Sequence, residues 1–252
     1  PLRQGVGGLR RASDIGKRRK TKSNGIASLR VMNANRPEHL ALPRAIGPYT
    51  VTRSTCIVST PLRTLMFGAF MWEHADNSDS YDGASKWTNC CCVGGVNHAS
   101  AMTASNNTFF WSMPGINESV LGKAVSLVPS AMTIQCMNPE ALQTTHGIVY
   151  AGSMPVVPKV LGDNRTWDEF SHQFVAFGKP RLCAAAKLAL SGVECSLVPM
   201  NMNALCEFTD LKDVVGAPTN GTWNSSGGNM IEPTGFAPLV VYNPDEIDLQ
   251  YL

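Results

Sequence analysis

The stretch from Ala131 to Pro158 constrains the fold most, because apolar and polar residues alternate along its first part, MTIQC (132–136). A period of two is typical of a half-buried β-strand. Asn138-Pro139 ends this strand, since a proline offers no N–H and pushes the preceding residue out of the helical region. After a polar connector, residues 147–151 indicate a second strand. The stretch therefore predicts a hairpin-like pair of strands that needs a further sheet to bury its apolar face.

Other short runs rich in Val, Ile, Thr and aromatic residues also predict strands. They lie at residues 49–60, 65–72, 87–93, 193–199, 237–242 and 248–252. One helix is expected to begin after Thr166, whose hydroxyl can form a capping box with Glu169, and a second is expected over 181–190. The pattern predicts an all-β fold with a few short helices in the connections, which is an ordinary fold class for 252 residues.

Positive charge is concentrated at the start of the chain. Residues 1–44 hold eleven Lys and Arg against two acids, which gives +9, and the remaining 208 residues hold ten against seventeen, which gives −7. Residues 1–25 also contain few large apolar side chains, so we expect a disordered arm that cannot bury enough surface to fold alone. Residues 26–47 are expected to form a linker or strap. The Gly47-Pro48 boundary then places the folded domain at 48–252.

The basic arm predicts contacts with a polyanion. Because it contains no aromatic residue, base stacking is unavailable and the contacts should be made to phosphates, with a strong dependence on salt. A solubilising tail or a nuclear-localisation signal are the alternatives. The candidate nucleic-acid-binding residues are Arg3, Arg10, Arg11, Lys17, Arg18, Arg19, Lys20 and Lys22.

Eight cysteines are present, and three of them, Cys90 to Cys92, are consecutive. No signal peptide and no apolar run near 18 residues is visible, which indicates neither export nor a membrane span, so we expect buried free thiols. Alternation along a strand would place Cys91 opposite its two neighbours. Since no CxxC motif occurs either, a zinc site is not expected.

The sequence contains no recognisable catalytic motif: HExxH, GxSxG and GK[ST] are absent, and the five histidines have no acid or cysteine at a known catalytic spacing. We therefore expect no enzymatic activity. Asp76, Asp79 and Asp82 lie in one loop, but their spacing of three differs from the alternate positions of an EF-hand. The loop that contains these three aspartates can therefore be either a solvated loop or a cation site.

Across most of its length the chain resembles the shell domain of capsid proteins of the nodavirus and tombusvirus kind, and the similar capsid proteins of bacilladnaviruses, the single-stranded DNA viruses of diatoms. The resemblance rests on the order of the basic arm and four segments. These are LPRAIGPYTVTRST (42–55), AMTIQCMNPEALQTTHGIVYAG (131–152), RLCAAAKLALSGVECSLVPMNMNALCEF (181–208) and TGFAPLVVY (234–242).

The resemblance implies an eight-stranded antiparallel jelly roll, a shell built from copies of the chain, and an arm that points inward onto the genome. It also implies calcium between subunits, for which Asp76, Asp79, Asp82, Asp163 and Asp168 are the candidate ligands. The chain stops where the family has another strand or two, which suggests a processed or trimmed form. No self-cleavage site of the nodavirus kind can be placed on it.

These observations together favour a structural capsid protein that self-assembles into an icosahedral shell and packages single-stranded RNA or DNA. Its expected location is the virion, assembled in the host cytoplasm or nucleus, without a membrane partner. Two rivals remain: a cellular nucleic-acid-binding β protein that does not assemble, and a Cys-dependent enzyme whose site forms only in space.

Overall fold

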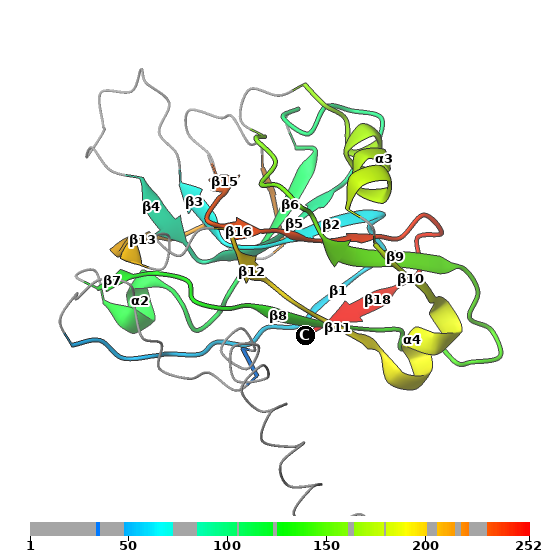
Figure 1. The fold of residues 1–252 in the computed structure, drawn as a ribbon, viewed down its shortest axis with the longest axis horizontal. Helices are drawn as coiled ribbons and strands as arrows, with labels where there is room; N and C mark the ends of the chain where they lie inside the picture. Colours follow the sequence, from blue (N-terminus) through cyan, green and yellow to red (C-terminus); the bar gives the residue numbers. More distant parts are fainter. Residues whose placement is uncertain are drawn as a thin grey trace, which may run out of the picture.

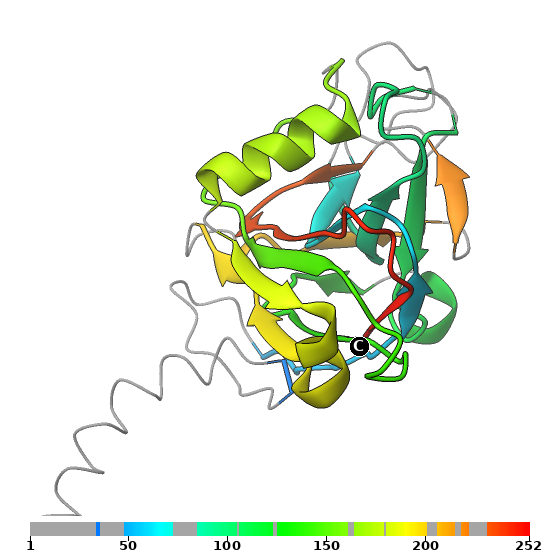
Figure 2. The same ribbon diagram turned by 90° about the vertical axis from the view of Figure 1, so that its right-hand side faces the viewer.

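Two antiparallel β-sheets face each other in the computed structural model, and a helix covers the outer face of the larger sheet (Figures 1 and 2). The structure describes residues 34–35, 48–72, 85–104, 106–122, 125–160, 164–178, 180–200, 206–214, 218–221 and 231–252. These residues are mostly β, with only short helices between strands, as the sequence predicts. None of the helices in this part of the chain has the length and apolar character needed to cross a membrane.

The larger sheet has seven strands in the order β10-β9-β17-β2-β5-β6-β14. They are β2 (Thr64–Phe67), β5 (Cys90–Gly95), β6 (Thr108–Ser112), β9 (Ile148–Ser153), β10 (Arg181–Ala184), β14 (Thr219–Gly221) and β17 (Leu239–Tyr242). Every neighbouring pair is antiparallel.

The smaller facing sheet has four antiparallel strands in the order β1-β18-β8-β11. They are β1 (Val58–Thr60), β8 (Thr133–Met137), β11 (Val193–Ser196) and β18 (Leu249–Tyr251). A five-stranded sheet in the order β15-β3-β4-β13-β7 lies on the left of Figure 1. Its strands are β3 (Phe70–Trp72), β4 (Lys86–Thr88), β7 (Ser126–Leu127), β13 (Thr209–Lys212) and β15 (Ile231–Pro233), and β12 (Val198–Pro199) pairs with β16 (Phe236–Ala237).

The main core fills the space between the seven-stranded and four-stranded sheets. Alternation along β2 points Leu65 and Phe67 into this space, and the ring of Phe67 lies 5.2 Å from that of Tyr251 in β18. Ile134 and Cys136 of β8 close it from the other side. The alternating pattern that predicted a half-buried strand is thus confirmed for β8, whose burial alternates along the strand.

A second core lies on the opposite face of the seven-stranded sheet, beneath helix α3 (Trp167–Phe177). Trp167, Phe170 and Phe174 of α3 are fully buried there and pack on side chains such as Met66 of β2. The hydroxyls of Thr64 and Ser171 hydrogen-bond at 2.6 Å and tie the sheet to the helix. Strand β2 is therefore buried on both faces of the sheet.

Helix α3 begins where the sequence predicts. Thr166 accepts a hydrogen bond from the backbone N–H of Glu169 through its hydroxyl, and the Glu169 carboxylate accepts from the N–H of Thr166. This reciprocal pair satisfies two backbone donors that the first helical turn leaves free. The two remaining described helices are α2 (Glu118–Leu121) and α4 (Ala185–Ser191).

The predicted pairing within residues 131–158 is wrong. Strand β8 pairs with β11 and β18 in the four-stranded sheet, whereas β9 pairs with β10 and β17 in the seven-stranded sheet. The connector between them carries the chain from one sheet to the other. Asn138 at its start is buried and donates to the backbone oxygen of Ala185 in α4 at 3.3 Å, so the crossing is anchored to the helix below it.

Three other predicted elements are corrected. The single strand predicted at 65–72 is two strands in different sheets, because the chain leaves β2 at Gly68-Ala69. The predicted strand at 49–60 is reduced to β1, and the side chain of Ser54 accepts a hydrogen bond from Gly115 N–H outside any ladder. The helix predicted at 181–190 starts only at Ala185, because residues 181–184 pair with β9 as a strand.

Candidate functional site

The predicted nucleic-acid-binding residues, from Arg3 to Lys22, lie outside the described residues. The first described residues after them in the sequence are Ala34 and Asn35, which lie against the four-stranded sheet. The backbone N–H of Ala34 donates to the hydroxyl of Thr133 in β8 at 3.0 Å, and Arg53 donates to the carbonyl of Asn35 at 3.3 Å. These contacts place the chain that follows the basic arm beside β8.

Of the five candidate calcium ligands, Asp76, Asp79, Asp82 and Asp163 also lie outside the described residues. Asp168 lies in the first turn of α3, where its carboxylate is 3.8 Å from the Arg63 guanidinium and 3.4 Å from Nδ1 of His98. Arg63 in turn lies 3.6 Å from Glu246. Asp168 therefore faces positively charged or neutral nitrogen groups rather than other carboxylates. Among the described residues, no group of three or more His, Cys, Asp and Glu side chains is arranged to hold a metal ion.

His98 is the buried member of this cluster, with 9% of its surface exposed. Burial lowers its pKa below the ordinary value of 6.5, and the positive charge of Arg63 acts in the same direction. The Asp168 carboxylate opposes this shift without overcoming it. The imidazole is therefore held neutral near pH 7, beside an aspartate that also pairs with Arg63.

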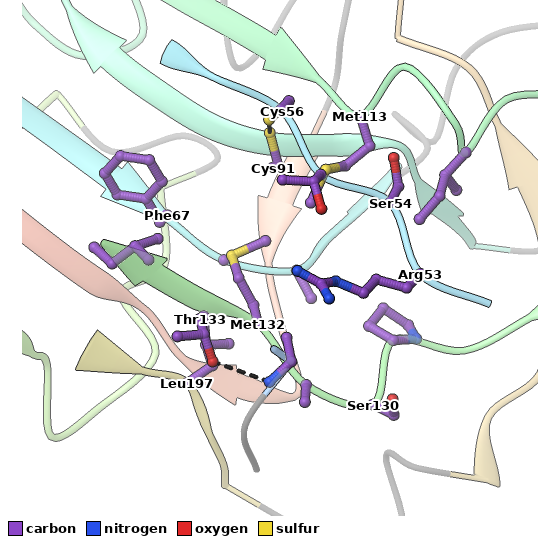
Figure 3. A pocket seen from close by; sticks show the side chains of 18 of the residues that line it. Arg53, Ser54, Cys56, Phe67, Cys91, Met113, Ser130, Met132, Thr133 and Leu197 are labelled. Carbon is purple, nitrogen blue, oxygen red and sulfur yellow. Dashed lines mark hydrogen bonds between the residues drawn. The ribbon is translucent and has the colours of Figure 1, made fainter. Parts of the chain in front are cut away.

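A cavity of about 210 Å³ opens between the two facing sheets, next to Ala34-Asn35 (Figure 3). Its walls are mostly apolar, with Phe67 of β2 on one side and Leu197 on another, and Arg53 lies at its rim. Sulfur-bearing residues are frequent in its lining, which includes Cys56, Cys91, Met113 and Met132. Thiol, thioether and guanidinium side chains therefore lie together around this cavity.

Two thiols face each other in this cavity. The Sγ atoms of Cys56 and Cys91 lie 3.6 Å apart, with a hydrogen bond between them (Figure 3). That hydrogen bond lowers the pKa of the half-buried Cys56, whereas it raises the pKa of the buried Cys91 together with desolvation. Cys56 is accordingly the group of the pair that ionises first, and Cys91 the donor that stabilises its thiolate.

The expected alternation of Cys90 to Cys92 is wrong, because a β-bulge interrupts the pairing of β5 with β6. Cys90 pairs with Ser112 and Cys92 with Trp111, so Cys91 is the extra residue. Cys91 and Cys92 consequently both point into the main core, and Cys90 points into the core beneath α3. The bulge is what aims Cys91 at Cys56.

All eight cysteines are free thiols, and six of them are buried. Sequence reasoning considered them as core residues or metal ligands and missed the Cys56–Cys91 pair. The two residues are 35 positions apart and no motif relates them. Only the approach of the β1 segment to β5 brings them together.

Comparisons with protein families, curated proteins and solved structures found no match to this chain.

Proposed function

We propose that this chain is a structural capsid protein: a jelly-roll subunit that self-assembles into an icosahedral shell and packages a single-stranded genome through its basic arm. The observation that carries the proposal is the segregation of charge, +9 on residues 1–44 and −7 on the rest. An acidic folded body with a basic extension places the polyanion contacts on the extension alone.

The fold supports this proposal through its layers. Two facing antiparallel sheets with a core between them are the general plan of jelly-roll subunits. A jelly roll also carries the chain repeatedly from one sheet to the other, as the connector between β8 and β9 does here. The five-stranded sheet is an addition to that plan.

Exposed apolar side chains at one end of the body support self-association. They lie around the edge strand β10 and helix α4, at the lower right of Figure 1. Leu182 is 59% exposed and Leu190 is 70% exposed, and Met137, Leu142 and Ile148 on the adjoining segments are also exposed. We call these five residues the β10–α4 patch. Exposed apolar side chains next to a sheet edge are typical of a protein–protein contact, and a second copy of the chain is the occupant that the capsid proposal requires.

The test of assembly is the size of the purified full-length protein by size-exclusion chromatography and negative-stain microscopy. We expect closed shells or large oligomers. Leu182→Asp should shift the protein toward small species while its circular dichroism spectrum stays unchanged. Val120→Asp is the matched control, because Val120 is 63% exposed but lies in α2, at the other end of the body (Figure 1). A monomer at every salt and protein concentration contradicts the proposal and favours the non-assembling nucleic-acid-binding protein.

The test of packaging uses the arm. Deleting residues 1–25 should abolish nucleic-acid binding and leave the fold intact. Replacing Lys17, Arg18, Arg19 and Lys20 with Gln should reduce the slope of log binding constant against log salt by roughly 3 for a single strand. Digestion of packaged material with RNase or DNase identifies the nucleic acid. If the truncated protein packages normally, the arm is not the genome-binding element.

A further inference from the structure

Cys56 and Cys91 lie in segments that lead to different sheets. Cys56 lies two residues before β1 of the four-stranded sheet, and Cys91 lies in β5 of the seven-stranded sheet. Their Sγ atoms are 3.6 Å apart, so a bond of about 2.05 Å requires an approach of roughly 1.6 Å. The partner that must move more is Cys56, whose segment from Pro48 to Ile57 contains no strand. A bond between these thiols would join the two sheets directly.

The two thiols also differ in the way that a disulfide-forming pair requires. Cys56 is half-buried on the wall of the open cavity, and its lowered pKa favours the thiolate, which is the attacking species. Cys91 is 3% exposed and cannot meet a large oxidant itself, yet it lies against Cys56. Cys56 is thus placed to react first and Cys91 to resolve the product.

We propose that Cys56 and Cys91 form a reversible disulfide that cross-links the two sheets when the protein meets a small-molecule disulfide such as oxidised glutathione. This inference is independent of the capsid proposal.

The reaction proceeds by two exchanges. The Cys56 thiolate attacks one sulfur of oxidised glutathione, forms a mixed disulfide and expels one glutathione thiolate. Cys91 then attacks Sγ of Cys56, loses its proton to the departing sulfur and releases the second glutathione. In total, the two protein thiols lose two electrons and two protons. Oxidised glutathione gains both and becomes two molecules of reduced glutathione. Arg53 at the rim of the cavity carries a charge that favours approach of the glutathione carboxylates.

The cross-link should stiffen the part of the body that contacts Ala34-Asn35. It would fasten the segment 48–57 to a central strand and close a loop of chain between residues that are 35 positions apart. Closing such a loop restricts the unfolded chain, so we expect the melting temperature of the oxidised protein to rise by several degrees, and added dithiothreitol to reverse the shift.

The experiment incubates reduced full-length protein with oxidised glutathione, unfolds it in urea with N-ethylmaleimide present so that every remaining thiol, buried or not, is alkylated, and measures the intact mass. The wild type should lose two of its eight alkylatable thiols and retain no glutathione. Peptide mapping should connect the peptide containing Cys56 to the one containing Cys91. Eight alkylated thiols, or a stable glutathione adduct at Cys56 in the wild type, would overturn the proposal.

Serine variants separate the roles of the two thiols. Cys91→Ser should trap the glutathione adduct on Cys56, and Cys56→Ser should prevent both the adduct and the cross-link. Cys195→Ser, which removes another half-buried thiol, is the matched control and should form the cross-link normally. A cross-link to Cys56 that persists in Cys91→Ser would show that another cysteine is its partner and contradict the proposed pair.

Discussion

At the scale of single residues, Gly95 shows how closely the sheet and its covering helix approach. A Cβ atom at Gly95 would lie 2.5 Å from the indole of Trp167, which is fully buried. We expect Gly95→Ala to lower the free energy of unfolding by about 1–3 kcal/mol, because the indole or the backbone must shift. Gly68→Ala is the control, since its nearest contact would be an ordinary 3.8 Å. Urea denaturation measures both, and equal effects would contradict the argument.

His98 predicts how stability depends on pH. Its pKa is lower in the folded protein than the 6.5 expected of the unfolded chain, so the unfolded state binds more protons as the pH falls. The stability it contributes is complete above pH 6.5 and is lost as the pH falls toward the folded pKa. Burial is the main cause of the lowered pKa and the charge of Arg63 adds to it, whereas Asp168 and Glu246 oppose it.

We therefore expect the urea concentration at the unfolding midpoint to decrease when the pH is lowered from 7.5 to 5.5. His98→Gln should make this decrease smaller. His146→Gln is the control, because His146 is exposed in the connector between β8 and β9. A dependence that is unchanged in His98→Gln would assign it to other groups.

At the scale of elements, the capping box of α3 should contribute measurably to stability. Thr166→Ala removes the oxygen that accepts from Glu169 N–H, and we expect a loss of about 1 kcal/mol in urea denaturation. Thr166→Ser keeps a hydroxyl and should retain most of that stability. If both variants behave alike, the hydroxyl is not what stabilises the start of the helix.

The elements also show which local patterns were reliable. The capping box and the buried face of α3 were predictable, because capping and helical period are encoded within a few neighbouring residues. The start of α4 was not, because RLCAAAKLAL (181–190) suits a helix throughout. Pairing with β9 holds residues 181–184 as a strand, so tertiary contacts override local preference there.

At the scale of the whole molecule, the seven-stranded sheet is shared by both cores, so we expect them to unfold together. Phe67 contacts the core between the sheets, and Phe170 the core beneath α3. Each change to alanine should cost about 3–5 kcal/mol, as expected for a buried aromatic side chain. Tryptophan fluorescence and far-UV circular dichroism should report coincident urea transitions in each variant. Separate transitions would show that the two cores unfold independently.

The sequence by itself determined the β-rich character of the chain, the position of α3 and the segregation of charge. These properties depend on residue type and on spacing over a few positions. The tertiary structure decided which strands pair, where β2 ends and β3 begins, and the meeting of Cys56 with Cys91. Such contacts join residues far apart in the chain, and their formation depends on which arrangement of sheets buries the most apolar surface at the least entropic cost. No local pattern carries that information. The sequence therefore predicted a hairpin at 131–158, whereas the two strands belong to different sheets.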